Sequence, residues 1–181
     1  MYPHERSLVA RMANRPFALI GVNSDKEKQR VFDAMKREGI TWRSFWNGGG
    51  TSGPISKQYG VRSWPTIYVL DHNGVIRAKN VRGDAMDKVV DQLVAEAEAE
   101  GLSGGTEPVS APAAAPDQSD PSANSGRPNP PAKSDFEPSG DVGFEIGDTA
   151  PDIDGADLSD VGFKLSDYRG KVVVLDFWGD W

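Results

Sequence analysis

The residues that most often carry side-chain chemistry are scarce in this chain. Among 181 residues there is no cysteine, and the two histidines, His4 and His72, lie far apart in the sequence. The lack of cysteine excludes disulfides, thiolate nucleophiles and thiolate metal sites, and two isolated histidines make a poor metal site. The sequence therefore predicts no metal, no cofactor and no catalytic residue in this chain.

Three other features could carry chemistry, and a plainer interpretation fits each better. The glycine-rich loop at residues 48–53 lacks the Gly-Lys-Ser/Thr ending of a phosphate-binding P-loop, which favours a flexible surface loop. Trp42 and Trp46 could line a groove, but aromatic residues at this spacing more often pack against a core. Asp176 interrupts an apolar run, and without a neighbouring thiol we assign it no catalytic role.

The elements that would position any site are those of an α/β protein. From residue 1 to about residue 101, helical and strand patterns alternate, as in a layered fold with some parallel strand pairing. Ser24 or Asp25 is expected to cap the second helix, and Gly39 to end it. The expected elements are a helix carrying Leu8, Val9 and Met12, a strand at 17–22, a helix carrying Val31, Phe32 and Met35, a strand at 40–45, a short helix at 55–59, a hairpin of strands 66–70 and 75–78 with an Asn73-Gly74 turn, and a helix with Met86, Val89, Val90, Leu93 and Val94 facing inward.

A different composition follows at residues 102–143. This region holds eight of the thirteen prolines and many serine, alanine and aspartate residues. Its one aromatic side chain is Phe136. Such a segment buries too little apolar surface to offset the entropy of ordering, so we expect a disordered linker. Residues 144–181 then regain a globular pattern and include a buried-strand sequence, 172–177, which needs a partner sheet.

The net charge of the chain argues against negatively charged binding partners. The formal charge of −7 and the sequence pI of about 4.8 argue against nucleic acid or an anionic membrane surface as a partner. No apolar run is long enough to cross a bilayer, and the first residues lack the pattern of a signal peptide. As written, the chain would be expected to stay in the cytoplasm.

The last residues resemble a known family. The motifs Gly147-Asp148-Thr149-Ala150-Pro151-Asp152 and 163–181, which reads FKLSDYRGKVVVLDFWGDW, are similar to the opening of redoxin domains of the TlpA/ResA and AhpC/TSA type. Residues 1–101 resemble the remainder of such a domain, including the hallmark run 64–71, WPTIYVLD. The resemblance implies a thioredoxin-like fold with a mixed central sheet flanked by helices, a cis peptide bond before Pro65, and thiol–disulfide oxidoreductase or peroxide-reducing activity.

In the family a reactive Cys-x-x-Cys follows the position of Trp181 and precedes the helix that Met1 opens. This chain therefore resembles a domain in permuted order, with its C-terminal part at 1–101, the linker at 102–143 and its N-terminal part at 144–181. Two tandem redoxin domains, each interrupted at the reactive position, would give this order. We hypothesise that selenocysteine occupies that position in the longer protein, because its UGA codon is read as a stop; an in-frame UGA directly after the Trp181 codon would be the signature.

Two functions of different classes follow from the resemblance. The first is a catalytically incomplete fragment of a tandem thiol–disulfide oxidoreductase whose reactive residue is cysteine or selenocysteine. The second is a cysteine-free peptide-binding or scaffold module with a permuted thioredoxin fold. Both imply disulfide-containing or extended protein segments as partners, and substrate-binding residues Trp64, Pro65, Thr66, Trp178 and Trp181. The chain is expected to be a monomer or a domain-swapped oligomer, and the resemblance points to an extracytoplasmic location.

Overall fold

The computed structural model describes residues 2–104 and 141–179. The longer helices follow a hydrophobic period of 3.6 residues, and the buried strands are almost continuous apolar runs. In chain order the elements are α1 (Tyr2–Arg11), β1 (Phe17–Asn23), α2 (Lys28–Glu38), β2 (Ser44–Trp46), the 3₁₀ turn η1 (Gly50–Ser52), α3 (Pro54–Gln58), β3 (Thr66–Leu70), β4 (Ile76–Lys79), α4 (Asp84–Ala99), β5 (Asp154–Ala156), β6 (Gly162–Lys164), η2 (Leu165–Tyr168) and β7 (Val172–Trp178).

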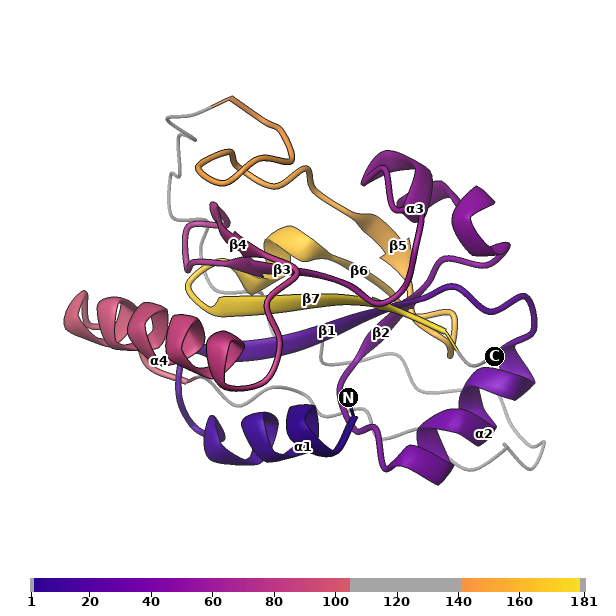
Figure 1. Ribbon diagram of the computed structural model, residues 1–181, viewed down its shortest axis with the longest axis horizontal. Coiled ribbons are helices and arrows are strands. Elements are labelled where there is room, and N and C mark those ends of the chain that lie inside the picture. The colour runs from indigo at the N-terminus through magenta and orange to yellow at the C-terminus, as the bar shows by residue number, and fades with distance from the viewer. Residues whose placement is uncertain (1, 105–140, 180–181) are drawn as a thin grey trace, which may run out of the picture.

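A five-stranded mixed sheet organises the fold, and its central strand comes from the C-terminal part of the chain. The strand order is β2-β1-β7-β3-β4 (Figure 1). β7 pairs in parallel with β1 from Phe17↔Val172 to Asn23↔Trp178, and antiparallel with β3 from Thr66↔Phe177 to Leu70↔Val173. Every residue of β7 is buried, as its almost uninterrupted apolar sequence requires of a central strand.

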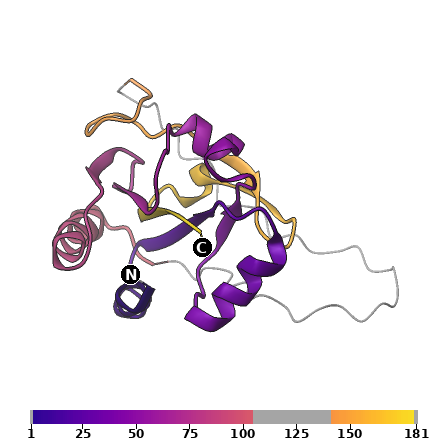
Figure 2. The same ribbon diagram turned by 45° about the vertical axis from the view of Figure 1, so that its right-hand side comes forward.

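The two faces of the sheet carry separate cores. On one face α1, α2 and α4 pack against alternate strand residues such as Leu19, Ile67 and Val174. On the other face α3 and the segments before β5 and before β7 cover the intervening residues, such as Ile20, Leu70 and Leu175. Figures 1 and 2 show this division, with α1, α2 and α4 on one side of the sheet and α3 on the other. Because side chains alternate between faces, Asp176 lies on the α1 side together with Val174 and Trp178.

The local expectations mostly hold, with three corrections. Neither Ser24 nor Asp25 caps α2, because four residues, 24–27, separate the end of β1 from the helix. The N-cap is Glu27, which makes no side-chain cap hydrogen bond. The strand expected at 40–45 is shorter and later, Ser44–Trp46, where the backbone comes beside β1. In the hairpin turn only Gly74 has a positive φ, 79°.

Several other expectations are confirmed. Gly39 ends α2 in the left-handed conformation, and the Trp64–Pro65 peptide bond is cis. Trp42 is buried in the core and Trp46 packs against it.

Two further features differ from what the sequence suggests. The loop after β2, expected to be a flexible surface loop, is more ordered, because Asn47 donates to the Gly50 carbonyl and Gly50–Ser52 forms a 3₁₀ turn. The short hairpin of β5 and β6 was not expected from the sequence.

This mixed α/β arrangement is consistent with a thioredoxin-like fold. The permuted order and the boundaries at 101 and 143 stay predictions. Most of the expected linker, residues 105–140, lies outside the described residues. Among the helices of residues 2–104 and 141–179, none has the length and apolar character needed to span a bilayer.

Candidate functional site

A cleft of about 710 Å³ lies where α1, the start of β3 and the start of α4 meet. A volume of this size falls within the range of small-molecule and peptide-side-chain pockets. Its walls combine apolar side chains with three ionisable ones. They are His4, Glu5, Trp64, Pro65, Ile67, Arg82, Gly83 and Met86.

Polar contacts hold the Trp64–Pro65 wall in place. The exposed Arg82 donates from Nη2 to the carbonyl oxygen of Pro65 at 2.7 Å. The indole Nε1 of Trp64 donates to Ser24 Oγ at 3.1 Å, which ties this wall to the end of β1. A ring nitrogen of His4 in α1 lies 3.1 Å from Asp87 Oδ1 in α4, and this contact joins the two helices beside the cleft.

Two buried carboxyl groups lie at this site. Glu5 of α1 is 1% exposed and Asp176 of β7 is 0% exposed. Within the described residues, none of their four carboxyl oxygens has a hydrogen-bond partner. An unpartnered carboxylate in a low-dielectric interior is costly, so both groups favour the protonated form.

The pKa values reflect this cost. Burial raises the pKa of Glu5 to about 7, against the opposing effect of the nearby His4. Burial also raises the pKa of Asp176 well above its ordinary value; the negative charge of Glu5 raises it further, and Arg82 opposes this. A carboxyl group that titrates near neutral pH can accept or donate a proton under physiological conditions, and Glu5 lines the cleft where it could do so.

The end of β7 meets the start of α1 beside these carboxyl groups. Tyr2, the first residue of α1, and Trp178, the last residue of β7, contact each other edge to face with their ring centroids 5.8 Å apart. The N-terminus of a helix carries a partial positive charge and unpaired backbone N–H groups. A group held between β7 and α1 would therefore be favoured in its anionic form.

The structure brings together only part of the predicted binding set. Trp64 and Pro65 line the cleft. Thr66 does not; its Oγ1 donates to the Ser63 carbonyl at 2.8 Å. Trp178 is 1% exposed and packs under the start of α1 instead. Trp181 lies outside the described residues. A binding role for these five residues stays a prediction.

Sequence reasoning missed Glu5 and Arg82 and gave Asp176 no role. A signal for Glu5 was present, because Glu5, Leu8 and Met12 follow helical i, i+3, i+7 spacing and therefore share one face. A carboxyl group on a face otherwise apolar predicts either a buried partner or a shifted pKa. Arg82 had no such signal, because its position depends on how the loop after β4 meets Pro65.

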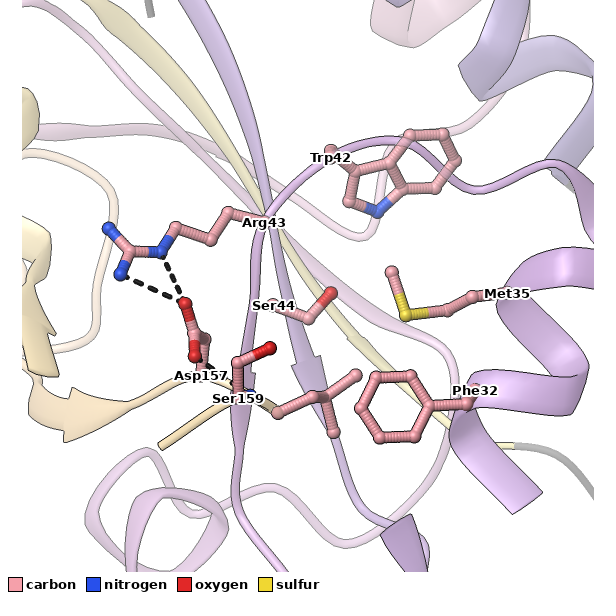
Figure 3. Close-up of a pocket in the computed structure, with 8 residues that line it drawn as sticks. Phe32, Met35, Trp42, Arg43, Ser44, Asp157 and Ser159 are labelled. Carbon is pink, nitrogen blue, oxygen red and sulfur yellow. Dashed lines mark hydrogen bonds and ion pairs between the residues drawn. The ribbon is translucent and has the colours of Figure 1, made fainter. Parts of the chain in front are cut away.

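A second cavity, near the β2 edge, is too small for a ligand. Its volume is about 30 Å³, roughly that of one water molecule. Figure 3 shows Arg43 paired with Asp157, at 2.9 Å, on one side and the side chains of Phe32 and Met35 on the other. The pair fastens the segment before β6 to β2, where Asp157 also forms a bridge with Phe45. This cavity is part of the packing between segments.

Within residues 2–104 and 141–179, no group of three or more acidic, histidine or cysteine residues is placed to hold a metal ion. In the cleft, the described residues offer a carboxyl group that titrates near neutral pH, Glu5, beside an apolar wall.

Comparison with known proteins gives a short, specific similarity. The chain is 56% identical over 36 residues to the thiol-disulfide oxidoreductase ResA of Geobacillus kaustophilus (strain HTA426), and 53% identical over 36 residues to ResA of Geobacillus thermodenitrificans (strain NG80-2). Each match covers 20% of this chain and 21% of the relative. No protein-family pattern and no solved structure matches the chain. The partial similarity suggests a thiol–disulfide oxidoreductase-like, thioredoxin-like family.

Proposed function

We propose that this chain is a catalytically incomplete part of a thiol–disulfide oxidoreductase, whose reactive pair belongs between the end of β7 and the start of α1. The observation that carries the proposal is the contact of Tyr2 with Trp178, 5.8 Å between ring centroids. It puts the first turn of a helix against the end of the central strand, the location at which a strand leads into a helix in a redoxin active site.

The surroundings of that location suit a reactive thiol. A helix N-terminus lowers the pKa of a cysteine placed on it, which increases the thiolate that attacks a disulfide. Glu5, buried beside it with a pKa raised to about 7, can accept the proton that the thiol releases. The cleft lined by Trp64 and Pro65 would take the extended segment that carries the substrate disulfide.

The complete protein would then be a tandem of such domains, with a cysteine or selenocysteine pair following Trp181 and disulfide-containing protein segments as substrates. Residues 141–179 would complete the sheet of residues 2–104 in this chain. The same pairing between separate copies would give a domain-swapped oligomer.

Adding the missing pair tests the proposal. The chain lengthened by Cys-Gly-Pro-Cys after Trp181 is expected to reduce insulin in the presence of dithiothreitol at least about tenfold faster than the free peptide Cys-Gly-Pro-Cys, because the helix N-terminus favours the thiolate. The initial rate of insulin precipitation gives the measurement.

Two controls accompany it. The chain lengthened by Ser-Gly-Pro-Ser has the same length and no thiol, and is expected to match the reaction without protein. The unmodified chain is expected to do the same. A lengthened chain that is no faster than the free dithiol peptide would show that this location does not activate a thiol, and would contradict the proposal.

The cleft also favours a second function, a binding module that needs no cysteine. Its apolar wall consists of the half-buried Trp64 and Pro65 together with the buried Ile67 and Met86. The unmodified protein is then expected to bind reduced and carboxymethylated ribonuclease A, an unfolded chain, and Pro65→Ala is expected to weaken this binding about tenfold or more. Fluorescence anisotropy of the labelled probe measures this, and unchanged binding by Pro65→Ala would place the ligand elsewhere.

A further inference from the structure

Ser24 lies at the junction of three segments of the chain. It follows the last residue of β1 and is 2% exposed. Its backbone N–H donates to the carbonyl of Trp178 at 2.9 Å, and its carbonyl accepts from the N–H of Gly50 at 2.9 Å. Its Oγ accepts from Trp64 Nε1 at 3.1 Å. One residue therefore joins the end of β7, the loop after β2 and the wall of the cleft.

Two further buried side chains hold the Ser24 hydroxyl in place. Asn47 Nδ2 lies 3.3 Å from Ser24 Oγ and 2.9 Å from Ser56 Oγ. Asn47 Oδ1 in turn accepts from the backbone N–H of Ser56 at 3.0 Å. Ser24, Asn47 and Ser56 are all less than 5% exposed. Hydrogen-bonded groups in a low-dielectric interior hold a defined geometry, because each unpaired group would be costly.

None of these three polar residues lines the cleft, whereas Trp64 does. Their effect on a ligand must therefore pass through the indole. Trp64 has a large flat side chain, and an indole whose Nε1 is bonded at a fixed point can rotate less about its side-chain torsions.

We propose that Ser24, supported by Asn47 and Ser56, is a positioning residue that fixes the Trp64 indole as a wall of the cleft and links it to the end of β7. The expected effect of Ser24 on ligand binding rests on the function proposed above, because it requires that the cleft binds an extended segment. Because the Ser24 N–H also donates to the Trp178 carbonyl, Ser24 connects this wall to the end of β7, where the reactive pair is proposed to lie.

The position of the indole can be measured without any ligand. The full chain is labelled with 5-fluorotryptophan, which keeps the indole N–H, and the Trp64 resonance is assigned by its loss in Trp64→Phe. Ser24→Ala is expected to shift and broaden the Trp64 ¹⁹F resonance, because the indole loses its acceptor. Ser44→Ala is the matched control: Ser44 is also 2% exposed, and its Oγ has no hydrogen-bond partner in the described residues. It is expected to leave the Trp64 resonance in place.

Binding is then measured with labelled, reduced and carboxymethylated ribonuclease A. Ser24→Ala is expected to weaken binding about three- to tenfold, the size of one hydrogen bond, and Ser44→Ala to leave it unchanged. In the Trp64→Phe background, which keeps an aromatic ring but has no indole N–H, Ser24→Ala is expected to have no further effect, because the two residues act through one bond.

The outcomes separate this inference from the proposed function. An unshifted Trp64 resonance in Ser24→Ala, or fully additive effects of Ser24→Ala and Trp64→Phe on binding, would overturn the positioning role. A wild-type chain that does not bind the probe would count against the binding function. The ¹⁹F resonance of Trp64 alone would then decide whether Ser24 fixes the position of the indole.

Discussion

Val174→Asp is expected to prevent folding of the chain. Val174 lies in the middle of β7, is 0% exposed and packs with the core beneath α1, α2 and α4. An unpaired carboxylate there loses its hydration without any compensating partner. The cost, about 5 kcal/mol or more, is comparable to the whole stability of a domain of this size. Far-ultraviolet circular dichroism and urea unfolding give the measurement.

The matched control for this variant is Val161→Asp. It makes the same substitution in the same C-terminal part of the chain, but Val161 is 53% exposed between β5 and β6. Its free energy of unfolding is expected to stay within about 0.5 kcal/mol of wild type. A Val174→Asp chain that unfolds at the wild-type urea concentration would mean that β7 does not occupy the centre of the sheet in solution.

Glu5→Gln is expected to stabilise the protein at pH 8 by about 3 kcal/mol and to remove the part of the pH dependence of stability that Glu5 causes. The pKa of Glu5 is raised by burial to about 7 in the fold, from the ordinary value of 4.5. The folded state therefore binds a proton that the unfolded state has released between these two values. Stability from this group is complete below about pH 4.5, falls as the pH rises toward 7 and is lost above it. Glutamine is neutral throughout, so the variant escapes the loss.

Urea unfolding at pH 5, 6, 7 and 8 measures this effect. At pH 5 the variant and the wild type are expected to be similar, because Glu5 is then protonated in the fold. In both chains Asp176 contributes a further loss of stability with rising pH, because its pKa is raised in the same direction. Glu27→Gln, at an exposed glutamate before α2, is the matched control and is expected to leave the pH dependence unchanged. Parallel curves for Glu5→Gln and wild type would show that Glu5 ionises normally in the fold.

Local sequence patterns were sufficient for most elements of the fold. The apolar runs at 17–22 and 66–70 correspond to β1 and β3, and the helical spacing of Val31, Met35, Val90 and Leu93 corresponds to α2 and α4. Gly39 and Gly74 were identifiable because a positive φ is accessible to glycine. Cap and strand ends were predicted less well, because the start of α2 and the extent of β2 depend on where neighbouring strands stop pairing.

The candidate site was predictable only in part. The Trp64-Pro65 motif marked one wall of the cleft, because the sequence itself resembles a known site. Thr66 and Trp178 belong to the same motifs but point into other surroundings, since neighbours along a strand face opposite sides and the last residue of β7 is covered by Tyr2. The sequence did not indicate Arg82, which is placed at the site by its hydrogen bond to the Pro65 carbonyl.

The sequence by itself determined that this chain has no thiol chemistry of its own, that it forms an α/β fold, and that a strand at 172–177 needs partners on both sides. These properties depend on composition and on periods of two and 3.6 residues, which act over short distances along the chain. Only the tertiary structure decided that Glu5 and Asp176 are buried at one site with raised pKa values, and that Ser24 bonds Trp64. Those facts depend on which faces meet when the sheet assembles. Ser24 and Trp64 are 40 positions apart and Glu5 and Asp176 are 171 apart, so no local pattern signals these contacts.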